Sequence, residues 1–107
     1  MILLRTIIIV LPEKQKEVFQ TLLSLIEPHG KAKGCLSYEI FNDIEDGKVF
    51  NLISAWETRL HLDTHIKSAK FTVLLGIRSL LCEPLKIQII TTAAVEGMEV
   101  VRSVRKK

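Results

Sequence analysis

The sequence predicts an α+β domain with the order β-α-β-β-α-β, in which four strands form an antiparallel sheet and both helical segments cover one face. Three patterns support this fold: an apolar run at residues 2–11, a helical period of apolar residues from Val18 to Ile26, and two alternating strands joined by Asp46-Gly47. Short connections of this kind favour right-handed crossovers between strands of one sheet. A chain of 107 residues is long enough for one domain with a single core.

The first two predicted elements are a strand and a helix. Residues 2–11 are nearly all apolar and rich in isoleucine, which is typical of a strand buried on both faces. Pro12 suits the first turn of a helix, where its missing N–H costs nothing. The spacing of apolar residues from Val18 to Ile26 indicates an amphipathic helix of about four turns. Pro28 and Gly30 should end this helix.

The next two elements form a hairpin. Residues 35–43 alternate as a strand, with Leu36, Tyr38 and Ile40 on one face and Ser37, Glu39 and Phe41 on the other. Asp46-Gly47 indicates a tight turn, because glycine tolerates the positive φ that such turns require. Residues 49–56 are the return strand and carry apolar side chains on both faces.

A second helical region in two parts and a last strand complete the domain. We expect Thr58 to cap the first part and Ser68 the second, because a hydroxyl at this position accepts a hydrogen bond from an early backbone N–H. Pro84 should stop the second part, and residues 85–94 are predicted to form the last strand.

The positive charge is confined to the C-terminal end. Residues 1–96 carry equal numbers of acidic and basic side chains, so residues 97–107 supply the whole formal charge of +3. We therefore divide the chain into a domain over residues 1–95 and a C-terminal basic arm over residues 96–107. In the arm, Met98, Val101 and Val104 recur at a spacing suited to packing on a second subunit.

Several partners are disfavoured by composition. A neutral body argues against nucleic acid, since such proteins spread basic residues over a folded face. No apolar run approaches the roughly 20 residues of a membrane span, and the first residues lack the pattern of a signal peptide. We therefore expect a cytoplasmic protein with no nucleic-acid or membrane partner. Cys35 and Cys82 are interpreted as small buried side chains rather than a disulfide.

The predicted sheet carries apolar residues on both faces. Ile7 and Ile8, Leu52 and Ile53, and Ile89 and Ile90 are neighbours that point to opposite sides of their strands. Helices cover only one face, and the other would expose an apolar area larger than monomers usually show. This predicts a homodimer that pairs sheet against sheet.

An ordered set of motifs resembles the antibiotic biosynthesis monooxygenase family of small dimeric α+β barrel proteins. The motifs are Gly34-Cys35-Leu36-Ser37-Tyr38, the acidic hairpin Asp43-Ile44-Glu45-Asp46-Gly47, Trp56-Glu57, His65, and Ser68-Ala69-Lys70-Phe71. They span about residues 3–92. The resemblance implies a ferredoxin-like subunit, a homodimer, and a pocket between the sheet and the two helical segments. Some members of the family oxidise phenolic substrates with molecular oxygen and without a metal or flavin.

The family's branches differ at positions that can be compared here. The haem-degrading branch has a Trp where this chain has His65, a haem-ligating His where it has Leu75, and an Asn near Ile7. All three differ, which disfavours haem degradation. The polyketide-oxidising branch shares Trp56 but has an Asn where Leu52 stands. Asn51 is offset by one residue, which puts it on the opposite face of the strand.

Six residues are candidates for a small-molecule site. His65 and Trp56 are the catalytic candidates: His65 would hold or accept a proton near neutral pH, and the resemblance implies that Trp56 stacks on a flat substrate. The alternatives are a partly buried His65 bonded to a carbonyl or carboxylate, and a Trp56 that is part of the core. Tyr38, Phe41, Asn51 and Phe71 are candidate substrate-binding residues; each could equally be core, or for Asn51 an interface residue. We expect no metal site, because His61 and His65 lack a third ligand, and no cofactor.

Three functions remain open at this point. The first is a cofactor-independent monooxygenase acting on a small aromatic, phenolic or quinone-like substrate. The second is a dimer that binds an aromatic ligand without chemistry, for example in a stress response. The third is an isomerase or lyase in which His65 moves a proton on a small metabolite. The motifs do not separate these alternatives.

Overall fold

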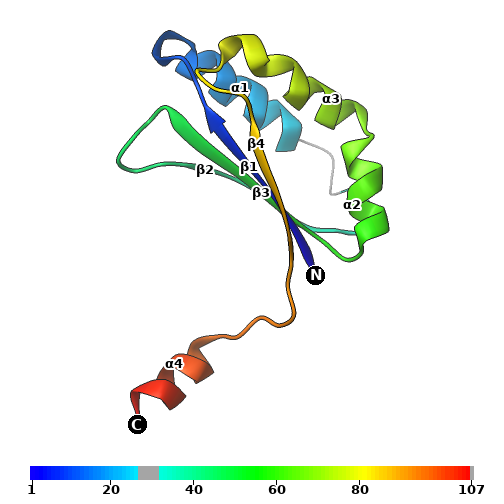
Figure 1. Cartoon of the computed structure of the whole chain (residues 1–107), viewed down its shortest axis with the longest axis vertical. Helices are drawn as coiled ribbons and strands as arrows, with labels where there is room; N and C mark the ends of the chain where they lie inside the picture. The colour runs from blue at the N-terminus through cyan, green and yellow to red at the C-terminus, as the bar shows by residue number, and fades with distance from the viewer. Residues whose placement is uncertain (27–31, 107) are drawn as a thin grey trace.

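The computed structural model describes residues 1–26 and 32–106, and it confirms the predicted fold class. Four antiparallel strands lie in the order β2-β3-β1-β4, and α1, α2 and α3 cover one face of the sheet (Figure 1). The strands are β1 (Ile2–Ile9), β2 (Cys35–Asn42), β3 (Val49–Trp56) and β4 (Lys86–Thr91). The helices are α1 (Gln15–Ile26), α2 (Arg59–Ile66), α3 (Ala69–Leu75) and α4 (Met98–Arg105), and 3-10 helices span Pro12–Lys14 and Gly76–Leu80.

The first strand and helix follow the sequence pattern closely. β1 is central, pairing with β3 on one side and with β4 on the other. Pro12 stands in the first turn of the 3-10 helix that leads into α1, and α1 turns Val18, Leu22 and Leu25 into the core. The predicted stop signals Pro28 and Gly30 lie outside the described residues.

A β-bulge changes the start of β2. Cys35 pairs with Trp56 and Ser37 pairs with Ala55, so Leu36 is an extra residue in the register. An extra residue shifts the alternation of side chains by one position. Cys35 therefore lies on the same side of the sheet as Tyr38, and Leu36 is exposed. The sequence pattern had placed Leu36, rather than Cys35, on the Tyr38 face.

Both predicted caps are present in the second helical region. The Thr58 hydroxyl accepts a hydrogen bond from the backbone N–H of His61 at 3.2 Å, and the Ser68 hydroxyl accepts one from Phe71 at 3.3 Å. α3 ends at Leu75, and a 3-10 helix continues to Leu80 before the chain reaches Pro84. The last strand is shorter than predicted because its pairing with β1 ends at Thr91.

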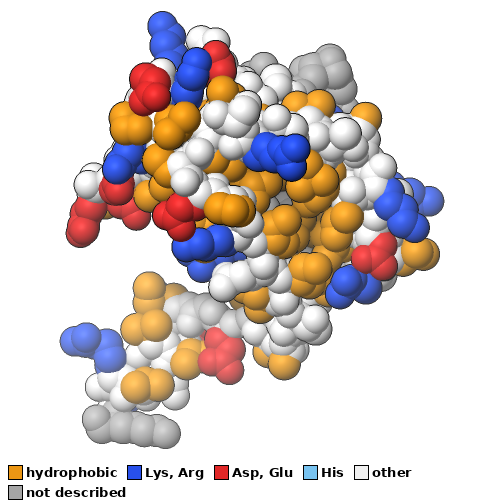
Figure 2. Space-filling model, turned by 45° about the horizontal axis from the view of Figure 1, so that its top comes forward, with side chains coloured by type: hydrophobic (Ala, Val, Ile, Leu, Met, Phe, Trp, Pro, Cys, Tyr) orange, Lys and Arg blue, Asp and Glu red, His pale blue; other side chains and the backbone are white. Residues whose placement is uncertain are grey.

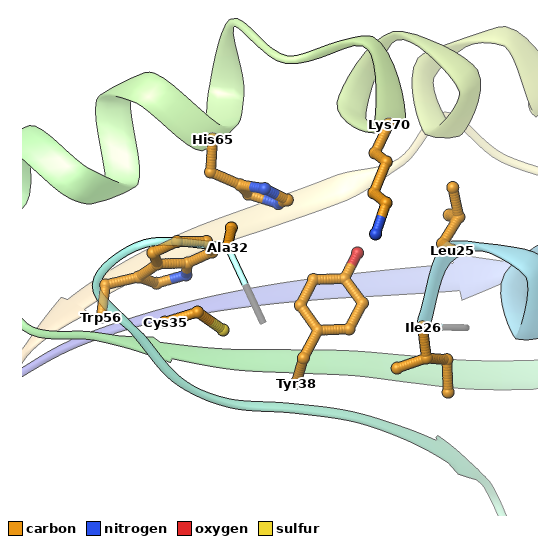
Figure 3. A pocket seen from close by; sticks show the side chains of 8 residues that line it. All are labelled: Leu25, Ile26, Ala32, Cys35, Tyr38, Trp56, His65 and Lys70. Atoms are coloured by element: carbon orange, nitrogen blue, oxygen red, sulfur yellow. The ribbon is translucent and has the colours of Figure 1, made fainter. Parts of the chain in front are cut away.

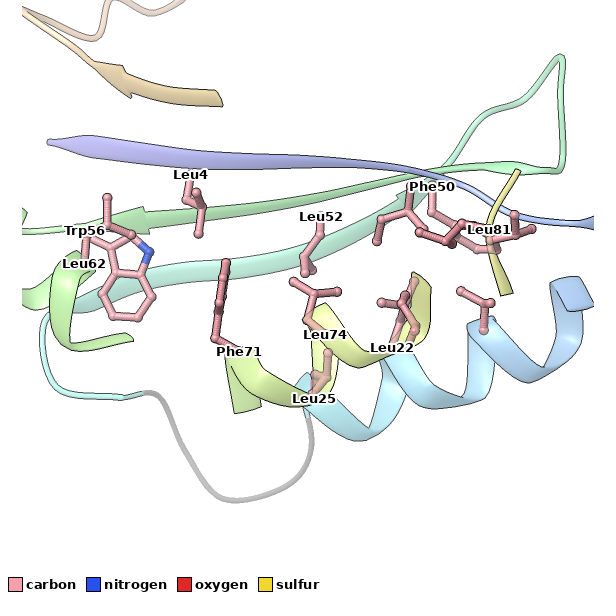
Figure 4. Packing of buried hydrophobic residues seen from close by; sticks show 14 residues of the cluster. Leu4, Leu22, Leu25, Phe50, Leu52, Trp56, Leu62, Phe71, Leu74 and Leu81 are labelled. Atoms are coloured by element: carbon pink, nitrogen blue, oxygen red, sulfur yellow. The ribbon is translucent and has the colours of Figure 1, made fainter. Parts of the chain in front are cut away.

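The core lies between the sheet and its three helices (Figure 4). Leu22 and Leu25 of α1 and Phe71 and Leu74 of α3 point toward the strands. The sheet contributes alternate residues of β1 and β3, and the fully buried ones include Ile8, Phe50 and Trp56. Trp56 closes the core at the end of β3, where the pocket begins.

The opposite face of the sheet is only partly covered within one chain. Apart from Ala55, which is buried, its apolar residues are half-buried or exposed; they are Leu3, Ile7 and Ile9 of β1, Phe41 of β2, Val49 and Ile53 of β3, and Ile90 of β4. β4 is an edge strand and is exposed along its whole length. This strand therefore lacks, in one chain, the two-sided burial that its sequence predicts.

The C-terminal residues form a short helix away from the domain. α4 stands clear of the sheet and of the other helices (Figure 1). Its hydrophobic side chains lie open on its surface beside charged ones (Figure 2), and Met98, Val101 and Val104 are all exposed. Within the described residues, no helix is both long enough and apolar enough to cross a bilayer.

Candidate functional site

A cavity of about 220 Å³ opens where the ends of β2 and β3 meet α1, α2 and α3. Figure 3 shows the side chains that line it. They are Leu25, Ile26, Ala32, Cys35, Tyr38, Trp56, His65 and Lys70. A cavity of about 150 Å³ admits benzene, and pockets for drug-sized ligands begin at about 300 Å³. The space therefore suits a ligand of one or two rings.

His65 lies at the centre of an aromatic cluster beside this cavity. Its ring stacks on Trp56 with the centroids 4.6 Å apart and the planes at 29°. Tyr38 and Phe71 meet it edge-on, at centroid distances of 5.7 and 5.6 Å. Only 6% of His65 is exposed, and within the described residues no side chain or backbone group is hydrogen-bonded to its ring. The imidazole nitrogens are therefore available to a ligand.

Local structure fixes each of these rings. Trp56 ends β3, and its indole N–H donates to the buried Ser54 hydroxyl at 2.9 Å. Tyr38 stands opposite Ser54 in the neighbouring strand. The position of His65 is set by the start of α2, which Thr58 caps. The position of Phe71, in the first turn of α3, is set by the cap at Ser68. The caps and the strand register together bring four residues from distant parts of the chain into contact.

The environment disfavours ionisation of both titratable rings. Burial, followed by the nearby charge of Lys70, lowers the pKa of His65 below its ordinary value of 6.5. Burial, followed by the neighbouring Cys35, raises the pKa of Tyr38 to about 12. At neutral pH the cavity therefore presents a neutral imidazole, which can accept a proton, and a phenol, which can donate a hydrogen bond.

Five lining residues were not among the sequence candidates, and two of them, Lys70 and Cys35, carry a polar or ionisable group. Lys70 is an exposed residue of α3 whose ammonium group points toward the Tyr38 hydroxyl (Figure 3). It lies five residues after His65, beyond the break between α2 and α3, and this spacing alone does not indicate that the two side chains share a cavity. Cys35 could not have been assigned, because its orientation depends on the bulge.

Three candidates do not line the cavity: Phe71, which contacts His65 from the core, and two residues that lie further away. Phe41 and Asn51 pair with each other on the outer face of the sheet, opposite the helices. Asn51 accepts a hydrogen bond from the Arg5 side chain at 2.9 Å, and Arg5 also donates to Gln88 at 3.2 Å. Arg5 thus hydrogen-bonds two side-chain amides within this face.

The two histidines of α2 do not share a ligand position. His61 Nδ1 lies 2.8 Å from the Thr58 hydroxyl, and its ring packs against Gly34, whereas His65 faces the cavity. Among the described residues, no three potential ligands are grouped closely enough to hold a metal ion.

These features define a small α+β protein with a ferredoxin-like sheet and an aromatic cavity under its helices. Residues 1–74 match the family described as antibiotic biosynthesis monooxygenase. Because the match covers more than half of the chain, the protein belongs to this family. Its fold is accordingly monooxygenase-like.

Solved structures agree on the fold. A conserved protein of Methanosarcina mazei is 27% identical with a TM-score of 0.78, over 85% of this chain and 91% of that one. A Pseudomonas aeruginosa protein is 26% identical with a TM-score of 0.76, over 87% and 94%. A structure described as an antibiotic biosynthesis monooxygenase is 23% identical with a TM-score of 0.79, over 88% and 100%, which shows the fold alone.

One curated relative matches part of the chain. An uncharacterised protein of Synechocystis sp. is 30% identical over 60 residues, which is 56% of this chain. The matched stretch is 41% of that relative, so the two proteins differ in overall length.

Proposed function

We propose that the protein is a cofactor-independent monooxygenase whose substrate is a small hydroxylated aromatic compound. The observation that carries the proposal is the cluster around His65: a neutral imidazole stacked at 4.6 Å on Trp56, at the wall of a cavity of one- to two-ring size. A flat ring in this cavity contacts Trp56 and the edge of Tyr38, as aromatic pairs prefer.

The proposed chemistry uses the substrate itself as the reductant of oxygen. His65 accepts the phenolic proton, which raises the electron density of the ring. The ring carbon para to the hydroxyl then reacts with O2. That carbon loses its hydrogen and becomes C=O, and the second oxygen atom leaves as water with the two hydrogens. A phenol and O2 thus give a quinone and water.

Each aromatic residue has a stated role in this proposal. Trp56, which is fully buried, stacks on the His65 ring and holds it at the wall of the cavity, Tyr38 donates a hydrogen bond to a substrate oxygen, and Phe71 supports the His65 ring from the core side. Phe41 and Asn51 are left out of the substrate site because they lie on the other face of the sheet.

Oxygen consumption with His65 variants tests the proposal. A panel of phenols, naphthols and quinols is screened by quenching of Trp56 fluorescence, with an oxygen electrode run in parallel. His65→Ala should abolish oxygen uptake; His65→Gln, which fills more of the space, guards against loss of the fold, monitored by circular dichroism. Turnover that is unchanged in a folded variant would refute the role of His65.

The same screen distinguishes the alternatives. Saturable quenching without oxygen loss or product would favour a non-enzymatic aromatic-binding protein. Exchange of deuterium into the ligand without oxygen loss would favour an isomerase or lyase. A neutral base, His65, next to a hydrogen-bond donor, Tyr38, also suits that chemistry.

We also propose that the working unit is a homodimer. The outer face of the sheet carries apolar residues on all four strands, too large an apolar area for a monomer to expose. Arg5 donates hydrogen bonds to Asn51 and Gln88 within this face, which satisfies donors of its guanidinium but does not neutralise its charge. Residues 96–107 act as an arm outside the domain of residues 1–95, and the apolar side of α4 packs on the second subunit.

Light scattering tests the dimer directly. The wild-type protein should have about twice the chain mass of 12.1 kDa, and Ile53→Lys, at the centre of the outer face, should give a monomer. A monomeric wild type at micromolar concentration would contradict the proposal.

A cytoplasmic location is consistent with two cysteines, Cys35 and Cys82, that form no disulfide.

A further inference from the structure

Lys70 places a positive charge at the mouth of the aromatic cavity. It is the second residue of α3 and belongs to the cavity lining. Figure 3 shows the Lys70 side chain extending from its helix so that the ammonium group faces the Tyr38 hydroxyl. Lys70 and His65 both enter the cavity from the side of the helices. The charge is close enough to His65 to oppose protonation of the imidazole.

This charge has no acidic partner among the described residues. The ion pairs they form join Arg59 to Asp63 and Lys86 to Glu83. The described residues that line the cavity include no Asp or Glu. Tyr38 and His65 are both neutral at pH 7 in this environment. The described wall therefore has a positive charge and hydrogen-bond donors, and no anion.

Helix stability does not account for a lysine at this position. The N-terminal end of a helix is the positive end of its dipole, where a cation is disfavoured by a few tenths of a kcal/mol and a carboxylate is preferred. α3 has no acidic residue in its first turn. A residue type that is unfavourable for the local secondary structure often marks a functional position.

We propose that Lys70 makes the cavity selective for an aromatic ligand that carries an anionic oxygen, as a carboxylate or a phenolate, held between the Lys70 ammonium and the Tyr38 hydroxyl. This inference rests on the proposed function, because it takes the cavity to be the ligand site. It narrows the substrate class from aromatics in general to aromatic acids and to phenols whose oxygen becomes anionic when His65 accepts the phenolic proton.

The cation also resolves a difficulty in proton transfer. A phenol with an ordinary pKa near 10 is a poor proton donor to an imidazole whose pKa is below 6.5. An ammonium group beside the substrate oxygen lowers the pKa of the phenol, because it stabilises the charged form. Lys70 is in this respect a positioning and electrostatic group, whereas His65 is the base.

Calorimetric titration with a matched pair of ligands tests the selectivity. The probes are 2-naphthoate, which is an anion at pH 7.5, and 2-naphthamide, which has nearly the same shape and no charge. They are titrated into the wild type, Lys70→Gln, Lys70→Arg and the control Lys67→Gln. Lys67 is an exposed lysine at the end of α2 that does not line the cavity, so its replacement changes the net charge equally.

The wild type should bind the naphthoate about tenfold more tightly than the amide, as expected for one charge-assisted contact to a partly solvated cation. Lys70→Gln should abolish this preference, whereas Lys70→Arg and Lys67→Gln should keep it. Equal binding of both probes to the wild type, or a preference that survives in Lys70→Gln, would overturn the role of Lys70 and leave the cavity as a ligand site. Binding of neither probe would instead count against the proposed function itself.

Discussion

The hydrogen bond between Trp56 and Ser54 should hold the wall of the cavity in place, and a double-mutant cycle can measure it. Both side chains are buried, with 0% and 1% exposure, and the indole N–H lies 2.9 Å from the hydroxyl. The variants are Trp56→Phe, Ser54→Ala and the double variant. Each single change leaves the other group buried without its partner, and the double change leaves neither.

The magnitudes follow from this geometry. Trp56→Phe removes one of two fused rings, about half of a Trp→Ala truncation, or about 2 kcal/mol. An unsatisfied Ser54 hydroxyl adds about 1.5 kcal/mol. Ser54→Ala strands the indole N–H and should cost about 2 kcal/mol. The double variant should cost about 2–3 kcal/mol, well below the sum of the single variants, which gives a coupling energy of about 3 kcal/mol.

Urea unfolding followed by far-ultraviolet circular dichroism measures these free energies without using the tryptophan signal. All four proteins are compared at one protein concentration, because a dimer's stability depends on it. Single-variant losses that add to the double-variant loss within about 0.5 kcal/mol would show that the two groups do not depend on each other. The indole would then be positioned by packing alone.

Three further predictions concern the same site. The Thr6 hydroxyl is buried and has no hydrogen-bond partner, so Thr6→Val should raise the free energy of unfolding by about 1 kcal/mol; a loss in the same urea assay would mean that the hydroxyl is satisfied. Gly34 has a φ of +79°, and a Cβ there would collide with the His61 ring. Gly34→Ala should therefore lower the free energy of unfolding by more than about 1 kcal/mol and weaken ligand binding. A thermal melt unchanged from wild type would contradict this prediction. The pKa of His65 is lowered in the folded state, so the unfolded chain binds its proton first as the pH falls below 6.5, and the free energy of unfolding should decrease there. His65→Gln should flatten the pH dependence of stability in this range. A pH profile identical to that of the wild type would show that other groups cause the decrease.

The fold was predictable because local signals and long-range pattern agree. The helix caps at Thr58 and Ser68 are short-range chemistry. The hairpin forms where it was predicted, but Gly47 does not take the positive φ expected of it; the carboxylates of Asp43 and Asp46 instead accept hydrogen bonds from backbone N–H groups of the loop. The core face of β1 and β3 was not predictable in this way, because both strands are apolar on both faces; the structure buries alternate residues of each. The end of α3 at Leu75 was not predicted, because the apolar spacing continues past it, and a 3-10 turn carries the same residues onward.

The candidate site was predictable only in part, for reasons that particular residues make clear. Tyr38, Trp56 and His65 were singled out by residue type, and the structure brings them together. The alternation of side chains along a strand already places Tyr38 and Phe41 on opposite faces of the sheet, because they are an odd number of residues apart. The position of Cys35 depends on a bulge, which leaves no mark in the alternation of so short a strand.

The electrostatics of the cavity restrict the chemistry more than its shape does. A base as weak as His65 cannot generate much carbanion or phenolate unaided, because its pKa is lowered by burial and by the nearby Lys70 charge. Yet the same cation stabilises the anion that the base would create. The pair therefore acts best on a substrate that is already acidic. An acidic phenol would reach the electron-rich state that O2 requires, whereas a neutral metabolite with a weakly acidic C–H would not. If Lys70→Gln lowers oxygen uptake more for weakly acidic phenols than for strongly acidic ones, the cation works through the substrate's pKa; an equal loss for both would assign it to binding alone.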